Sequence, residues 1–374
     1  MQLKASALVA YNAALLFASV AFASPVSTTS NFIVFGNSLS DNGNAAKAFG
    51  DTGYWEGRYS NSYVWNEYTS KLLGMNLINK AYGGATSNND ISPAFAGNAS
   101  IPSFHDQVTS WLSENPSPSQ FNLDNDIIQI EIGANDILHN VQNFVTDPSS
   151  FQSFAVNVAK SIATDIQTLI DAGYKNIDLW NIPAIERTPS VLSLHVSAQM
   201  QGVVQGMNSA IAQLVGSVSA NNKANPNNVH IFDLYSLVTT CLEPQLLSAL
   251  GITDSTDACY STDSKGDVSI CSNPDEHFFY DGVHPASRVH YTWGVVAAVL
   301  TRNQSTTLDA NEILSLIKSF DIGSSNVDDN IIADGINSSE SQVIPLPPTA
   351  TEDPVPTSTE PSGNVHTTTV YKCH

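Results

Sequence analysis

The sequence contains little positive charge. Only 14 of its 374 residues are Lys or Arg, against 35 Asp and Glu, so the formal net charge is -21 at pH 7. Binding to nucleic acids depends chiefly on Lys and Arg side chains that neutralise phosphates, and adsorption to anionic membranes has a similar requirement. The composition therefore argues against a nucleic-acid partner and against an anionic membrane surface.

Long apolar stretches are scarce, and the one candidate lies at the N-terminus. Lys4 is followed by the apolar run Ala5 to Val20 and then by Ala21-Phe22-Ala23, a small-x-small cleavage pattern. This arrangement is typical of a secretory signal peptide over residues 1–23, with a membrane anchor as the alternative. We expect a secreted, extracellular protein without stable membrane insertion.

Cysteines are few, and an exported chain keeps them in an oxidising setting where disulfides persist. The four residues are Cys241, Cys259, Cys271 and Cys373. Four cysteines allow three pairings, of which we favour Cys259 with Cys271, because they bracket a short Ser-, Asp- and Gly-rich loop. A zinc site is the alternative, but no Cys-x-x-Cys pair is present. Asn-x-Ser sequons, compatible with glycosylation, occur at Asn98, Asn303 and Asn337.

Short β-branched runs alternate with longer helical stretches as far as about residue 319. The expected strands are Phe32 to Phe35, Asn76 to Ala81, Asp126 to Ile132, Asn176 to Trp180 and Val229 to Leu234. The expected helices are Ser62 to Leu73, Ser150 to Ala172, Ser197 to Ala220 and Arg288 to Leu300. Strands separated by helices predict a parallel sheet covered on both faces, a three-layer α/β/α fold with ligands at the carboxyl ends of the strands.

The composition changes after residue 322. No Lys or Arg occurs between residues 323 and 371, and six of the eighteen prolines lie between Pro345 and Pro361. Such a segment buries too little apolar surface to offset the entropy lost on ordering. We therefore predict a folded domain over residues 24–322 and a disordered, acidic Ser/Thr/Pro-rich tail over 323–374. Cys373 is the one feature that argues for docking of the tail.

Three segments place reactive side chains directly after expected strands. In the first, Gly36-Asn37-Ser38-Leu39, a serine in a tight turn can present its hydroxyl group to a cleft. In the second, Gly133-Ala134-Asn135-Asp136, the asparagine amide can donate to a developing oxyanion. In the third, Asp281-Gly282-Val283-His284-Pro285, a carboxylate can orient an imidazole that acts as a base. Each segment alone is more often an ordinary capping or turn sequence.

In combination, the segments resemble the GDSL, or SGNH, ester hydrolases over roughly residues 31 to 300. Gly83-Gly84 after the second strand belongs to the same ordered set of motifs. Two further segments, Gly57-Arg58-Tyr59-Ser60-Asn61 and Asn181-Ile182-Pro183, are similar to the secreted fungal and plant-type branch of that family. The resemblance implies the flavodoxin-like SGNH hydrolase fold.

The resemblance also implies a role for each matching residue. Ser38 matches the family's nucleophile, His284 its general base and later acid, and Asp281 the carboxylate that orients the histidine. The oxyanion hole would combine the N–H of Ser38, the N–H of Gly84 and the side-chain amide of Asn135. One departure is plain: the family's first block reads Gly-Asp-Ser, and this chain has Asn37 before the serine.

Asn37 keeps an acceptor oxygen of the same reach but carries no charge. A carboxylate at this position would disfavour the oxyanion and stabilise protonated His284. We therefore expect an Asn37→Asp enzyme to remain active, with the acidic limb of kcat/KM moved upward by up to about one pH unit.

A metal site is the competing interpretation of the same region. His277, Asp281, His284 and His290 lie close in sequence, but none of their spacings is the i, i+4 pair that places two His ligands on one helical face. We expect neither a metal nor another cofactor. Four tryptophans are candidates for a pocket wall, although aromatic side chains more often fill the core: Trp55, Trp65, Trp111 and Trp180.

These features predict a secreted serine esterase that acts through an acyl-enzyme. We expect it to be a monomer that binds neither nucleic acid nor a membrane. Its substrate would be a small-molecule, lipid or carbohydrate ester. Short-chain esters, such as acetyl groups on carbohydrates, fit an acidic exported protein. Lipase or lysophospholipase activity on longer acyl chains is the alternative within the enzyme class. The alternative from another class is a non-catalytic binding protein on a hydrolase fold, and the departure from the family's pattern at Asn37 is the feature that favours it.

Overall fold

The computed structural model describes residues 30–50, 54–116, 121–222, 228–263, 265, 267–303, 306 and 308–324. The expected signal peptide and residues 325–374 of the expected tail lie outside the described residues, as do Asn337 and Cys373. Ile322, at the end of the expected domain, is fully buried in the core.

A five-stranded parallel sheet forms the centre of the molecule, with the order β2-β1-β5-β6-β7. The strands are β1 (Asn31–Gly36), β2 (Asn76–Asn79), β5 (Ile127–Glu131), β6 (Asn176–Trp180) and β7 (Asn228–Phe232). All five expected strands are therefore present, in the flavodoxin-like order. The expected end of the last strand at Leu234 is wrong, because the Asp233 side chain accepts from the N–H of Ser236 and begins helix α9 (Leu234–Cys241).

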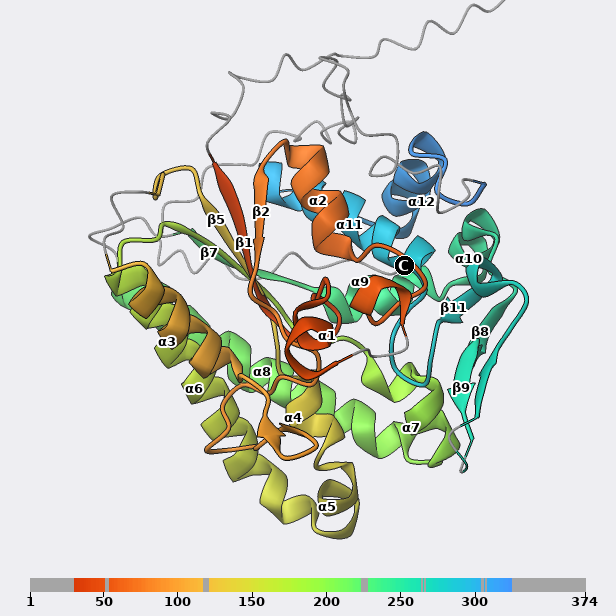
Figure 1. The fold of residues 1–374 in the computed structure, drawn as a ribbon, viewed down its shortest axis with the longest axis horizontal. Coiled ribbons are helices and arrows are strands. Elements are labelled where there is room, and N and C mark those ends of the chain that lie inside the picture. The colour runs from red at the N-terminus through yellow and green to blue at the C-terminus, as the bar shows by residue number, and fades with distance from the viewer. Residues whose placement is uncertain are drawn as a thin grey trace, which may run out of the picture.

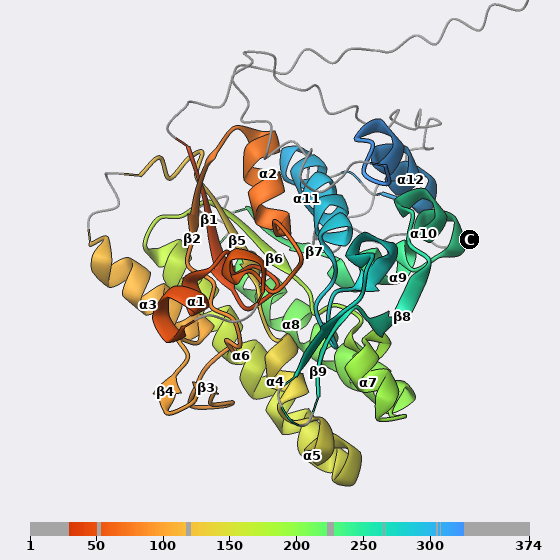
Figure 2. The same ribbon diagram turned by 45° about the vertical axis from the view of Figure 1, so that its right-hand side comes forward.

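Helices cover both faces of the sheet, as Figures 1 and 2 show. Successive side chains of β1 alternate between the two faces. Phe32 and Val34 pack with one helix layer, and Ile33 and Phe35 with the other. The first layer contains α2 (Trp65–Leu73), α9, α11 (Ser287–Arg302) and α12 (Ala310–Ser319), and the second contains α3 (Phe104–Glu114), α6 (Phe151–Asp171) and α8 (Ser197–Asn221). The predicted three-layer α/β/α fold is confirmed.

Buried apolar positions on the helices explain why they dock. On α6 they include Val158, Ile162, Ile166 and Leu169, spaced three or four residues apart. Each fully buried side chain of this size contributes about 1.5–3 kcal/mol relative to an exposed one. The expected helix from Ser62 begins only at Trp65, because the Glu67 side chain accepts from the N–H of Val64 and fixes the start there.

The helices α3, α9 and α12 were not predicted. Several shorter elements that surround the sheet were not predicted either. They are α1 (Asn44–Phe49), β3 (Phe95–Ala96), β4 (Ala99–Ser100), α4 (Ala134–Leu138), α5 (Val141–Thr146), α7 (Pro189–Ser193) and α10 (Pro244–Leu250), with single 3-10 turns at Trp55–Gly57, Pro148–Ser150, Ile185–Arg187 and Pro274–Glu276. Among the described residues, no helix combines the length and the apolar character needed to cross a bilayer.

Two small sheets precede α11 along the chain. β8 (Asp254–Ala258) pairs with β11 (His277–Phe279), and β9 (Tyr260–Thr262) pairs with β10 (Val268–Ile270). The disulfide Cys259–Cys271 joins this region, so the favoured pairing is present. Cys241 is fully buried, and burial raises the pKa of its thiol to about 12.

Candidate active site

The candidate site lies where the strand order reverses. β1 and β5 are neighbours in the sheet, although β2 precedes β5 in the chain. Ser38 follows β1 by two residues, and Gly133 to Asn135 follow β5. In open parallel sheets the carboxyl ends of two such strands leave a crevice that can hold a ligand.

A tight turn carries Ser38. The carbonyl oxygen of Asn37 accepts from the N–H groups of Ser40 and Asp41, at 3.1 and 2.9 Å. The turn also requires glycine before it, because a Cβ atom on Gly36 would lie 2.5 Å from the carbonyl oxygen of Glu131. Ser38 itself is buried, with 7% of its surface exposed.

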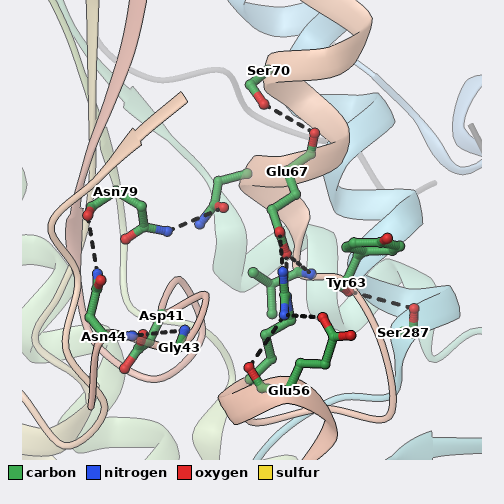
Figure 3. A network of polar contacts seen from close by, with 12 residues as sticks. Asp41, Gly43, Asn44, Glu56, Tyr63, Glu67, Ser70, Asn79 and Ser287 are labelled. Atoms are coloured by element: carbon green, nitrogen blue, oxygen red, sulfur yellow. Dashed lines mark hydrogen bonds and ion pairs between the residues drawn. The ribbon is translucent and has the colours of Figure 1, made fainter. Parts of the chain in front are cut away.

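Asp41 ties this turn to the chain segment after β2. Its Oδ1 accepts from the N–H groups of Gly43 and Asn44, at 2.8 and 2.6 Å, contacts that Figure 3 shows. Its Oδ2 accepts from the N–H of Gly83 at 2.8 Å. The Asn44 side chain donates to the carbonyl oxygen of Asn79 at 3.1 Å, which links the same loop to the end of β2. These bonds fix the turn that carries Ser38 relative to the Gly83-Gly84 segment.

The predicted serine, histidine and aspartate form a continuous chain of polar contacts. Nε2 of His284 lies 2.7 Å from Oγ of Ser38, and its Nδ1 lies 2.7 Å from Oδ2 of Asp281. Oδ1 of Asp281 accepts from the N–H groups of Val283 and His284. Burial raises the pKa of Asp281, but the charge of His284 and the hydrogen bonds from His284, Tyr54 and Val283 lower it by more. The pKa of Asp281 is therefore below its ordinary value.

Tyr54 adds a fourth member that the sequence analysis missed. Its hydroxyl group donates to Oδ2 of Asp281 at 2.6 Å. Tyr59 packs against the His284 ring, with centroids 5.1 Å apart. Burial, followed by the charge of Asp281, raises the pKa of Tyr54, so its hydroxyl group keeps its proton. A tyrosine shortly before the Gly57-Arg58 segment carries no signal in the sequence that would have identified this contact.

The predicted oxyanion donors lie on three neighbouring segments. Asn135, in the first turn of α4, donates one amide hydrogen to the carbonyl oxygen of Ala85 at 2.9 Å, which leaves the other hydrogen available. Gly84, directly before Ala85, has a φ of +84°, a conformation that favours glycine. Within the described part of the chain, the N–H groups of Ser38 and Gly84 donate to no other residue.

Asp136 holds the Gly133–Asp136 segment against the chain that follows Gly84. Its carboxyl group accepts from the N–H of Ser87 at 2.9 Å and from the Ser87 hydroxyl group at 2.6 Å. Complete burial raises the pKa of Asp136 to about 7, against the opposing effect of the Ser87 bonds.

An apolar cavity of about 40 Å³ opens beside Ser38, Asn135 and His284. Its apolar wall includes Leu39, Ala184, Val238, Phe278, Phe279 and Trp293. Gly84 is not part of this wall. Neither are Trp55, Trp65, Trp111 and Trp180, of which the last three are buried in the core. The space therefore leads from the polar groups toward the layer that contains α9 and α11.

The histidines of the metal interpretation have other partners. Nδ1 of His277 lies 3.3 Å from the carbonyl oxygen of Asp257. His290 is fully buried, its Nδ1 accepts from the N–H of Trp65, and burial lowers its pKa to about 3. In the described ranges, no group of three or more His, Cys, Asp and Glu side chains is placed to hold a metal ion.

Comparison with known proteins identifies relatives. Residues 32–294 match the model of the family described as GDSL-like lipase/acylhydrolase. The chain is 24% identical over 277 residues to the thermolabile hemolysin of Vibrio parahaemolyticus, covering 69% of this chain and 60% of that protein. It is 36% identical over 127 residues to the acetylesterase of Thermothelomyces thermophilus, covering 33% and 39%.

A third relative is the phosphatidylcholine-sterol acyltransferase of Aeromonas hydrophila. The chain is 27% identical to it over 327 residues, which covers 74% of this chain and 91% of that protein. By contrast, the matches to the hemolysin and the acetylesterase extend over less than two thirds of those two proteins.

Proposed function

The chain belongs to the GDSL-like lipase/acylhydrolase family, and from this membership we propose that it is a serine hydrolase of carboxylic esters. The observation that carries the proposal is the continuous contact from Ser38 through His284 to Asp281, with both distances at 2.7 Å. A nucleophile, a base and a group that orients the base are thereby within hydrogen-bond reach of one another.

In the proposed reaction, Oγ of Ser38 attacks the ester carbonyl carbon while Nε2 of His284 takes the serine proton. The tetrahedral intermediate collapses, the C–O bond to the alcohol breaks, and His284 returns the proton to the departing alkoxide. Water then attacks the acyl-enzyme with His284 as base, and the acid leaves as Ser38 recovers its proton. Asp281 stays ionised and stabilises the imidazolium, and no cofactor takes part.

The negative charge that develops on the carbonyl oxygen would be met by three donors. They are the N–H groups of Ser38 and Gly84 and the free amide hydrogen of Asn135. Donors aimed at charge that exists only in the transition state lower the barrier without tightening substrate binding. The shared contact of Asn135 with Ala85 supports this assignment, because it places the amide next to Gly84.

The cavity supports short acyl groups as the substrate class. One water-sized group needs about 10–15 Å³ of such space, so about 40 Å³ accommodates roughly three of them. An acetyl to butyryl group fits this volume, with the ester carbonyl between Ser38 and Asn135. An acetylesterase is among the relatives. A phosphatidylcholine-sterol acyltransferase is also among the relatives, and it keeps longer acyl chains as the alternative.

We further propose that the enzyme is exported, acts as a monomer and belongs to the secreted fungal or plant-type branch. The disulfide Cys259–Cys271 supports export, because disulfides persist mainly in oxidising compartments. Asn98, the first sequon, is exposed in a short loop between β3 and β4, which is compatible with glycosylation of an exported chain.

Two measurements test the proposed function. A fluorophosphonate should label the folded protein on Ser38, and Ser38→Ala should remove the label and the hydrolysis together. A series of p-nitrophenyl esters from acetate to palmitate, beside an acetylated oligosaccharide, should give the highest kcat/KM for the shortest chains. An unlabelled but folded protein would contradict the serine hydrolase and favour the non-catalytic binding protein. A maximum at long chains would identify a lipase or lysophospholipase.

A further inference from the structure

Glu131 is a buried acid that the proposed reaction does not use. It is the last residue of β5, lies opposite Gly36 in the sheet register and is 1% exposed. The rest of its strand is largely isoleucine. Burying a carboxyl group is costly unless hydrogen bonds replace its contacts with water. The groups that supply those bonds therefore show what the residue is for.

Both of its partners belong to the turn that carries Ser38. The amide of Asn37 donates to Oε1 of Glu131 at 3.1 Å, and the hydroxyl group of Ser40 lies 3.4 Å from Oε2. Oδ1 of Asn37 in turn accepts from the N–H of Leu39 at 2.9 Å. Asn37 is itself 2% exposed. The carboxyl group thus anchors the turn on both sides of the nucleophile, from the adjacent strand.

The hydrogen bond between residues 37 and 131 depends on the asparagine that this chain has at position 37. Where the family's first block has aspartate, a carboxylate at position 37 would lie about 3 Å from the carboxyl group of Glu131, and two carboxylates that close cannot both stay ionised at low cost. The chain instead pairs one amide with one carboxyl group. Burial raises the pKa of Glu131 to about 7, and no charged side chain contributes to that shift.

We propose that Glu131 is a positioning residue for Ser38 and that it forms a matched pair with Asn37, in which a carboxyl group at position 37 is tolerated only when position 131 carries an amide. As a role in catalysis, this rests on the proposed ester hydrolysis. The proposal replaces the expectation from sequence that Asn37→Asp alone merely moves the acidic limb of activity, because that expectation did not include Glu131.

Four proteins test the pair: the wild type, Asn37→Asp, Glu131→Gln and the double variant. Glu131→Gln keeps an oxygen for the Asn37 amide, so it should retain activity within about threefold. In Asn37→Asp the two carboxyl groups can share one proton at about pH 5.5 but repel each other at about pH 8. In the double variant the glutamine amide donates to the new carboxylate, which restores the hydrogen bond with its direction reversed.

We expect kcat of Asn37→Asp for p-nitrophenyl acetate to fall at least about tenfold at pH 8, with KM little changed and a smaller loss at pH 5.5. Adding Glu131→Gln should return kcat to within about threefold of wild type at both pH values. The melting temperature should follow the same order, with Asn37→Asp losing stability as the pH rises and the double variant recovering it.

Two results would overturn the pair: an Asn37→Asp protein with the wild-type pH profile and melting temperature, or a double variant as impaired as Asn37→Asp. If Asn37→Asp fails to fold, recovery of folding in the double variant decides the question. The melting temperatures test the pair even if the wild type hydrolyses no ester, so failure of the proposed function is recognised separately.

Discussion

The hydroxyl group of Tyr54 donates a hydrogen bond of 2.6 Å to the carboxylate of Asp281. The accepting oxygen, Oδ2, is also the one that lies 2.7 Å from Nδ1 of His284. Hydrogen bonds to ionised groups are roughly twice as strong as those between neutral groups. Tyr54 therefore restricts the carboxylate that orients the histidine, from a chain segment more than 200 residues away.

Replacing Tyr54 by phenylalanine should remove this restriction while keeping the ring contacts. We expect kcat for a short-chain ester to fall roughly 3- to 30-fold with little change in KM, because the lost bond acts on His284 and not on the substrate. Tyr59→Phe is the matched control, since Tyr59 also packs on the His284 ring but makes no hydrogen bond to Asp281. Equal losses in the two variants would contradict the role of the Tyr54 hydroxyl group.

Asn135→Ala should lower kcat by about 10² to 10³ with KM nearly constant, because in the proposed mechanism its free amide hydrogen is used only when the oxyanion forms. Steady-state kinetics with p-nitrophenyl acetate measure both parameters. The exposed Asn143, replaced by alanine, serves as the control and should leave both unchanged. An effect of Asn135→Ala confined to KM would show that the side chain binds substrate in its ground state.

Val238→Ala should extend the accepted acyl chain. Val238 lines the cavity, and removing two methyl groups makes room for about one or two further carbons. A methylene group in an apolar pocket changes kcat/KM by roughly tenfold or more. The ratio of kcat/KM for p-nitrophenyl hexanoate to that for acetate should therefore rise about tenfold. Val296→Ala, buried in α11 away from the cavity wall, should leave the ratio unchanged.

Asp136 should make the fold less stable as the pH rises. Burial holds its pKa at about 7 in the folded state, above the ordinary value of 3.8, so the folded protein binds more protons between these limits. Its stabilising contribution is complete below about pH 4 and is lost as the pH rises through 7, by on the order of 4 kcal/mol.

Urea denaturation of the wild type and Asp136→Asn at pH 5 and pH 8 measures this effect. The asparagine keeps hydrogen bonds with Ser87 but does not titrate, so the variant should show the smaller difference between the two pH values. Asp124→Asn, at a mostly exposed side chain, should behave like the wild type. A wild-type difference retained in full by Asp136→Asn would assign it to other groups.

Removing the disulfide with Cys259→Ser and Cys271→Ser should lower the free energy of unfolding. The two residues are 12 positions apart, and closing a loop of this size contributes about 3 kcal/mol through the unfolded state. Tyr260, next to Cys259, packs on Tyr54 with centroids 5.1 Å apart. We therefore also expect a loss of kcat of a few fold, roughly the effect of loosening one ring contact. Urea denaturation and kinetics on the purified variant test both effects.

Much of the architecture was predictable because it depends on local periodicity. The β-branched runs of β1, β5 and β6 and the three-to-four-residue spacing of α6 specify buried strands and a docked helix whatever their neighbours are. Boundaries were less predictable where a single side chain decides them. Asp233 ends β7 earlier than its apolar pattern suggests, and Glu67 starts α2 later. The amphipathic helix α12 was missed, although Ile313, Leu316 and Ile317 share one face and the Asp309 side chain caps its start.

By itself, the sequence determined the fold class, the family and the candidate residues Ser38, His284 and Asp281, because these depend on residue types at particular places in an ordered set of motifs. Only the tertiary structure decided which side chains hold these candidate residues in position. Glu131 is an acid in a buried strand, which a pattern can show to be unusual but not explain, and Tyr54 carries no pattern at all. Their partners are 94 and 227 residues away, and such contacts exist only once the sheet register and the loop packing bring the atoms together.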